Sequence, residues 1–230
     1  MCGVFGFIAK TDDDRPDMAR LERIATATER RGPHAFGFSW IDSRGRLRMF
    51  KQTGRISCAL GCLAMASDAR MLIGHCRWAT QGSPENNLNN HPHPVDGGWL
   101  VHNGVIPRYD DLVEGHLLQP VGQCDSEAIG LLIEELDGTL VERCAQATVA
   151  LDSPAVVLAL WNAPRRLVAV KRGNPLLIAE DDGGFYLASL AGGLPRPVRQ
   201  VPEDTALSVS YRDGRARIAR HPLGEVLSTC

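Results

Sequence analysis

The segment Met1-Cys2-Gly3-Val4-Phe5-Gly6 opens the chain and carries its first structural and chemical signal. Removal of one methionine places a cysteine at the N-terminus, so that a thiol and a free α-amine share one residue. That amine has an ordinary pKa of about 7.7–8.0 and can accept a proton near neutral pH. A nucleophile beside a base is what covalent acyl transfer requires. Because Met-Cys also occurs by chance, the interpretation depends on the rest of the chain, beginning with a buried strand predicted over residues 4–9.

The composition is that of a globular protein. The 230 residues are 44% hydrophobic and 23% charged, which fits one domain over residues 1–230. The formal net charge of −2 provides no basic surface for nucleic acid or an acidic membrane. We find no apolar run of the ~18–20 residues that span a membrane, and we expect no signal peptide.

Cysteine usage indicates a reducing compartment. The seven cysteines are scattered along the chain, which favours free thiols over a disulfide framework. We therefore expect a cytoplasmic protein without nucleic-acid or membrane partners. Cys58 and Cys62 are close enough to share a helix face, but no second pair completes a zinc site. We expect both to be buried as small hydrophobic residues.

Hydrophobic periodicity predicts strands towards both ends of the chain with helices inserted between them. Strands are expected over residues 4–9, 36–41, 47–52, 71–76, 99–102, 155–161, 166–170, 176–179, 185–190, 198–201, 206–210 and 215–219. Helices are expected over residues 16–31, 126–136 and 139–151, and a long loop over residues 81–94. This order suggests sheet-on-sheet packing with the helices outside.

Four polar and glycine-rich segments stand out as chemistry-bearing. They are Met1–Gly6, Arg31-Gly32-Pro33-His34-Ala35-Phe36-Gly37, the run Gly74-His75-Cys76-Arg77-Trp78-Ala79-Thr80-Gln81-Gly82 with the later His91-Pro92-His93, and His102-Asn103-Gly104 followed by Cys124-Asp125-Ser126-Glu127. In order and spacing they resemble the motifs of the class II, N-terminal-nucleophile glutamine amidotransferases. Within that family the glutaminase domain of glutamine–fructose-6-phosphate aminotransferase is the most similar.

The resemblance implies a fold and a domain organisation. The expected fold is α+β, the Ntn-hydrolase four-layer αββα sandwich of two mainly antiparallel sheets flanked by helices. Residues 1–230 would form a single glutaminase domain without an acceptor or synthase domain. The resemblance implies neither a cofactor nor a metal.

It also implies catalytic roles. Cys2 attacks the side-chain amide of L-glutamine to form a thioester, using its own amine to move the proton. The side-chain amide of Asn103 and the backbone N–H of Gly104 serve as oxyanion donors, each such donor being worth roughly 2.7–4 kcal/mol. Glycine at position 104 would let the substrate approach that N–H closely. Taken alone, Asn103-Gly104 is also a common hairpin turn.

Substrate recognition is assigned in the same way. Arg77 binds the α-carboxylate through two parallel hydrogen bonds, and Asp125 pairs with the α-ammonium. The pocket is lined by Trp78, Thr80 and Gln81, while Arg31 and His102 are supporting residues, Arg31 near the nucleophile. Taken alone, Arg77 would be a surface ion-pair residue and Asp125 a helix N-cap.

Four histidines could suggest a metal site by composition: His75, His91, His93 and His102. We expect structural hydrogen bonding for them instead, with no metal. Four residues depart from the family pattern, namely His34 for aspartate, Phe36 for a small residue, Gln81 for histidine and Cys124 for threonine or serine. We expect altered pocket tuning at Gln81 and no catalytic role for Cys124.

The resulting hypothesis is a glutaminase subunit that releases glutamate and ammonia and delivers ammonia to a separate synthase. One alternative is an amidohydrolase of another γ-glutamyl amide. Another is a non-catalytic domain that binds glutamine for regulation. Intact Cys2, Asn103 and Gly104 favour the enzyme.

Overall fold

Two antiparallel sheets form the centre of the molecule. The computed structural model describes residues 2–228. One sheet has the order β11-β9-β10-β1-β4-β2-β3 and the other β13-β12-β8-β7-β6-β5. The first contains β1 (Gly3–Ala9), β2 (Ala35–Ile41), β3 (Leu47–Thr53), β4 (Met71–Arg77), β9 (Leu177–Glu180), β10 (Gly184–Ala188) and β11 (Arg199–Gln200); the second contains β5 (His93–Val95), β6 (Gly98–Asn103), β7 (Ala155–Asn162), β8 (Arg165–Arg172), β12 (Thr205–Arg212) and β13 (Arg215–Pro222).

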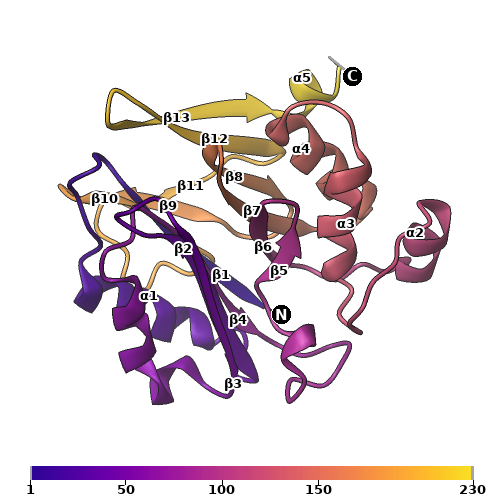
Figure 1. Cartoon of the computed structure of the whole chain (residues 1–230), viewed down its shortest axis with the longest axis horizontal. Helices are drawn as coiled ribbons and strands as arrows, with labels where there is room; N and C mark the ends of the chain where they lie inside the picture. The colour runs from indigo at the N-terminus through magenta and orange to yellow at the C-terminus, as the bar shows by residue number, and fades with distance from the viewer. Residues whose placement is uncertain (1, 229–230) are drawn as a thin grey trace.

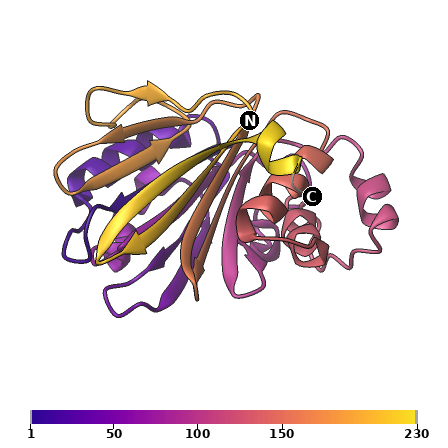
Figure 2. The ribbon, with the colours of Figure 1, turned by 90° about the horizontal axis from the view of Figure 1, so that it is seen from above.

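Helices cover the two outer faces. Figures 1 and 2 show α1 (Met18–Glu29) on one side of the strands and the pair α3 (Glu127–Glu135) and α4 (Leu140–Ala150) on the other. The remaining helical segments are α2 (Tyr109–Gly115), α5 (Leu223–Leu227) and the 3-10 turns η1 (Ile56–Cys58), η2 (Leu60–Ala66) and η3 (Asn87–Asn89). No helix within residues 2–228 is long and apolar enough to span a membrane.

Side-chain alternation in β1 explains the layering. Phe5 and Phe7 pack with α1 residues in one core, whereas Val4 and Ile8 pack in a second core between the sheets. Successive strand residues point to opposite faces, so a strand buried on both faces is apolar throughout. A third core joins β6, β7 and β8 to α3 and α4. Three apolar layers therefore separate the four layers of secondary structure.

Most predicted elements are confirmed to within a few residues at their ends. The structure adds β5 inside the predicted 81–94 loop and finds α2 and α5, which the periodicity did not indicate. The expectation for Cys58 is wrong, because this residue is exposed, and Cys62 is only partly buried. Both lie in the irregular η1–η2 segment rather than on one α-helical face.

Candidate active site

Cys2 lies immediately before β1 and is held by the end of β4. The backbone N–H of Trp78 donates to the Cys2 sulfur at 3.3 Å, and the thiol lies 3.5 Å from the Trp78 carbonyl oxygen. Gly3 pairs with Cys76, so this end of β1 lies beside the end of β4. Burial raises the pKa of the Cys2 thiol above its ordinary value, against the opposing effect of the Trp78 N–H. The thiol therefore needs a base before it can act as a nucleophile.

The end of α1 fixes the backbone of Cys2. Arg31 donates from Nε to the Cys2 carbonyl oxygen at 2.7 Å. Gly32 follows, and a Cβ there would lie 2.3 Å from the Arg77 carbonyl carbon and 2.5 Å from the Trp78 nitrogen. Only glycine permits this close approach of two backbones. The supporting position predicted for Arg31 is thus beside the nucleophile.

His34 holds the backbone just after β4, next to the Trp78 residue that contacts Cys2. The Ala79 N–H donates to Nδ1 of His34 at 3.0 Å, and the His34 ring lies 4.9 Å from the Trp78 ring, centroid to centroid. The imidazole therefore accepts a hydrogen bond where the family pattern has an aspartate. Phe36, the other departure in this segment, is buried in the core between β2 and α1.

Arg77 is buried and is not a surface ion-pair residue. Its Nη1 donates to Oδ1 of Asn90 at 3.0 Å, and its Nη2 donates to the carbonyl oxygens of Gln81 and Gly82. Both acceptors of Nη2 are backbone oxygens, so a two-bond carboxylate clamp through this nitrogen would replace one of them. In this state the guanidinium shapes the 81–90 loop.

Asn103 ends β6 at the same end of the sandwich. His75, on β4, donates from Nε2 to the carbonyl oxygen of His102 at 2.9 Å, which ties the two sheets together beside Asn103. The Asn103 side chain is fully buried, and within the described chain neither its amide nitrogen nor its oxygen has a hydrogen-bond partner. An unpaired buried amide is costly to keep. Its donor is therefore free for a ligand.

Gly104 has an intramolecular reason to be glycine. A Cβ at this position would lie 2.3 Å from Nε2 of His102 and 2.9 Å from the Pro154 carbonyl oxygen. These contacts require glycine in addition to the expected close approach of substrate. The hairpin alternative is wrong, because β6 pairs with β7, which begins far along the chain at Ala155.

A short network joins His102, Ser126 and Asp125. The Ser126 hydroxyl donates to Oδ1 of Asp125 at 3.3 Å and lies 2.9 Å from Nδ1 of His102. Because the Ser126 hydroxyl proton is directed to the Asp125 carboxylate, Nδ1 of His102 donates to the Ser126 hydroxyl oxygen. Burial lowers the pKa of His102 to about 4, with Asp125 opposing the shift, so the ring is neutral.

Asp125 is buried and does not cap α3. Its Oδ2 accepts the Ile106 N–H at 2.9 Å, whereas Ser126 occupies the N-cap and makes no side-chain capping bond. The N-cap alternative is therefore wrong. The carboxylate is fixed from two sides and lacks a cationic partner in the described salt bridges.

The predicted pocket-lining residues differ in how close they lie to the nucleophile, and their side chains are exposed. Trp78 contacts the nucleophile through its backbone, while its side chain is 45% exposed. Thr80 and Gln81 are exposed. Gln81 also borders a cavity of about 250 Å³, together with residues Pro107–Asp111. That cavity lies between Gln81 and the start of α2, and none of the residues Cys2, Arg77, Asn103 and Asp125 lines it.

Comparison with known proteins settles the family. A family model described as glutamine amidotransferases class-II matches residues 20–160. The chain belongs to the class II glutamine amidotransferase family. The glutamine–fructose-6-phosphate aminotransferase (isomerizing) of Xylella fastidiosa strain Temecula1 is 34% identical over 226 residues, which cover 93% of this chain and 36% of the relative. That of Geobacillus kaustophilus is 32% identical over 211 residues, which cover 88% of this chain and 34% of the relative.

This class II amidotransferase chain spans about a third of the length of those relatives. Among solved structures, glutamine phosphoribosylpyrophosphate amidotransferase from B. subtilis aligns with a TM-score of 0.74 at 20% identity, covering 95% of this chain and 49% of that one. The likeness confirms the predicted α+β sandwich of two antiparallel sheets flanked by helices.

Sequence reasoning missed several residues that position the amidotransferase site. The backbone of Ala79, the hydroxyl of Ser126 and the amide of Asn90 each hold a predicted site residue or its neighbour. Asn90 lay in a segment expected to be loop, so no periodicity marked it as buried. Ser126 stands in the predicted segment Cys124-Asp125-Ser126-Glu127, but the sequence assigned it no role.

Proposed function

We propose that this amidotransferase chain is a single glutaminase domain that hydrolyses the side-chain amide of L-glutamine. Cys2 attacks the amide carbon, ammonia leaves, and water then releases glutamate from the thioester. The observation that carries the proposal is the buried, unpartnered amide of Asn103, located at the same end of the sandwich as Cys2. A preorganised donor of this kind stabilises the oxyanion of a tetrahedral intermediate.

The proton transfer assigns a role to the N-terminus. The raised pKa of Cys2 disfavours a free thiolate, so the α-amine released by removal of Met1 is proposed as the base. Met1 itself lies outside the described residues. Gly104 is proposed to provide the second oxyanion donor through its backbone N–H.

Recognition of the amino-acid head group is proposed for two buried residues. Asp125 presents a fixed carboxylate that forms no salt bridge with the rest of residues 2–228, and it is proposed to bind the α-ammonium. Arg77 is proposed to bind the α-carboxylate by exchanging one of its carbonyl contacts. Trp78, Thr80 and Gln81 border this pocket, with Arg31 and His102 as positioning residues.

A finer proposal concerns the use of the ammonia and the cellular location of the protein. We propose that a separate synthase uses the released ammonia, since the residues described at this site are all assigned to the binding or turnover of glutamine. The six described cysteines that are free thiols support a cytoplasmic setting. If the isolated chain aminated an acceptor unaided, this part of the proposal would be wrong.

The central experiment measures glutamate and ammonia release from protein shown by mass spectrometry to lack Met1. Wild-type protein is expected to turn over glutamine, and Cys2→Ala is expected to bind glutamine without turnover. γ-Glutamyl conjugates are tested in parallel, and a higher kcat/KM for one of them would reassign the substrate. Glutamine binding without turnover in the trimmed wild type would contradict the enzymatic proposal.

A further inference from the structure

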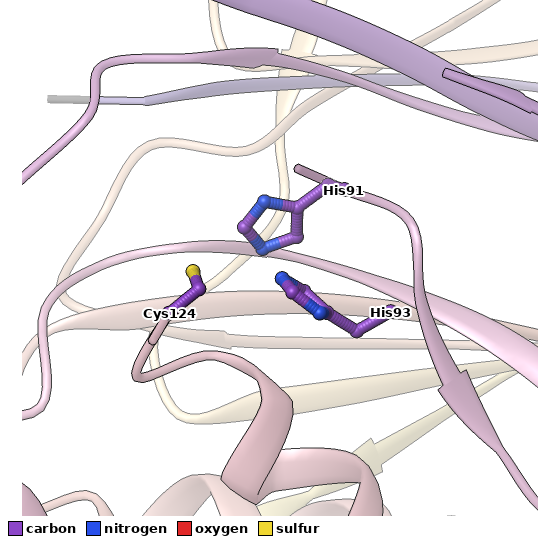
Figure 3. Close-up of side chains that lie close together, drawn as sticks. All are labelled: His91, His93 and Cys124. Atoms are coloured by element: carbon purple, nitrogen blue, oxygen red, sulfur yellow. The ribbon is translucent and has the colours of Figure 1, made fainter. Parts of the chain in front are cut away.

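His91, His93 and Cys124 bring three metal-ligating side chains together in the interior. Each residue offers one ligand atom, and these atoms all lie within 4.8 Å of one another. Figure 3 shows the Cys124 sulfur and the two imidazole rings facing a common space, with the histidines entering from the β5 side and the cysteine from the loop before α3. All three residues are buried.

The histidines of this cluster lack the hydrogen bonds expected of structural residues. Within the described residues, neither ring nitrogen of His91 has a partner, and Nε2 of His93 has none. Buried polar side-chain atoms are normally hydrogen-bonded, so each exception needs an explanation. The rings contact one another instead, with His91 and His93 centroids 4.5 Å apart in an edge-on arrangement.

The neighbouring histidines show that hydrogen bonding explains only part of the group. His75 donates from Nε2 to the His102 carbonyl oxygen, and His102 is bonded to Ser126 through Nδ1. Within the described residues, His75 and His102 therefore each make the expected structural hydrogen bond through one ring nitrogen, and His91 makes none. His75 also leaves Nδ1 without a partner while its ring lies 3.8 Å from that of His91, centroid to centroid.

We propose that His91, His93 and Cys124 bind a zinc ion. Imidazole nitrogen and thiolate sulfur are the ligands that Zn²⁺ prefers, whereas magnesium and calcium require oxygen. Three protein ligands leave the fourth tetrahedral position for water or another donor. On binding, the Cys124 sulfur forms the metal bond and its proton passes to solvent. The site is distinct from the Cys2 sulfur, which contacts the backbone of Trp78.

The surrounding charges are mixed. Burial lowers the pKa of the His93 ring well below its ordinary value, and the positive charges of Lys51 and Arg77 lower it further. Asp125 follows Cys124 and accepts a hydrogen bond from its thiol at 3.8 Å, so a carboxylate lies beside the sulfur. Together with the thiolate, this carboxylate offsets the two cationic side chains.

The test is metal binding by the whole chain, and it requires no enzymatic activity. Protein is stripped with a chelator, desalted into a non-thiol reductant, and titrated with Zn²⁺ against a chromophoric chelator. We expect one high-affinity zinc per chain. Cys124→Ser keeps the size of the side chain but removes the soft ligand, and is expected to weaken binding by more than the roughly 10–100-fold typical of changes to outer-shell partners.

Cobalt provides a second readout. Co²⁺ at this site is expected to give a thiolate-to-cobalt charge-transfer band that is absent in Cys124→Ser and retained in Cys2→Ala and Cys62→Ser. His93→Gln is expected to weaken binding as well, with circular dichroism confirming its fold. Two results would overturn the proposal: no stoichiometric zinc binding by wild type, or equal affinity and an unchanged cobalt band in Cys124→Ser.

Discussion

The two halves of the candidate site differ in how their polar groups are satisfied. On the β1–β4 side, the Cys2 sulfur and carbonyl, Arg31 and the Ala79 N–H all have hydrogen-bond partners within the chain. On the β5–β6 side, buried atoms without partners among the described residues gather at His91, His93, His102 and Asn103, and His75 of β4 adds one more beside His91. Because unpaired buried atoms are costly, we expect ligands to bind at the second half. The first half is positioned by the chain itself.

The largest expected effect contrasts two buried asparagines. The side-chain amide of Asn103 has no partner among the described residues, whereas that of Asn90 accepts from Arg77 and donates to Pro84 and Asn87. Asn103→Ala is expected to lower kcat by about 10²–10³-fold through loss of an oxyanion donor, with almost unchanged free energy of unfolding. Asn90→Ala is expected to destabilise the protein by about 1–3 kcal/mol. Steady-state kinetics and urea unfolding of both variants measure the contrast.

Two results would contradict the roles assigned to these asparagines. If Asn103→Ala lost as much stability as Asn90→Ala, its side chain would have a structural partner in solution. If Asn103→Ala retained full kcat, Asn103 would have no catalytic role.

Gly104 tests how tightly the ligand side is packed. Gly104→Ala places a Cβ 2.3 Å from Nε2 of His102, and such overpacking typically costs about 1–3 kcal/mol. Pro154 limits the alternative direction, since its carbonyl oxygen would be 2.9 Å away. We expect a lower midpoint of thermal unfolding, partly restored when His102→Ala is added. Gly115→Ala is the control, because a Cβ there has no heavy atom within 4 Å, and we expect it to change the midpoint of thermal unfolding little. Gly97→Ala, in the β5–β6 turn, is not a suitable control, because its φ of +66° would be strained for alanine.

These residues also show how far sequence reasoning reaches. Strands such as β7 were predictable because an unbroken apolar run fits a strand buried on both faces. α2 was not, since seven residues containing Asp110 and Asp111 have no long apolar stripe and so short a helix depends on tertiary contacts. The order of the motifs indicated the site residues of the amidotransferase family. Which of their polar atoms remain unpaired depends on packing between distant segments, which no local pattern encodes.

Cys144 is a buried thiol outside the candidate site, so it shows what burial alone does to the pKa of a cysteine. This thiol lies in the core between α4 and the second sheet, where burial raises its pKa to about 12, with Arg143 opposing. A raised folded-state pKa contributes stability that is fully present below the ordinary value of 9.0 and is lost as pH rises towards 12. At pH 10.5 the loss from this thiol is about 2 kcal/mol.

The measurement is urea unfolding at pH 8 and pH 10.5 in a non-thiol reductant. Wild type is expected to lose more stability between these values than Cys144→Ala, although the variant starts lower because of its cavity. Tyr186 and Tyr211 also have pKa values raised by burial, but they are common to both proteins. An equal pH dependence in the two proteins would mean that the thiol is accessible to solvent in the folded state.

The smallest expected effect concerns His34, on the β1–β4 side, where the polar groups have hydrogen-bond partners within the chain. Its Nδ1 accepts the Ala79 N–H next to the residue that contacts Cys2. His34→Leu removes the acceptor and is expected to cost about 1 kcal/mol of stability, together with a several-fold loss in kcat from a less well-positioned thiol. His34→Asn retains an acceptor oxygen and should recover most of both. If His34→Leu and His34→Asn behaved alike, packing against Trp78 rather than the hydrogen bond would be the contribution of this side chain, and the nucleophile would depend on Arg31 and β4 for its position.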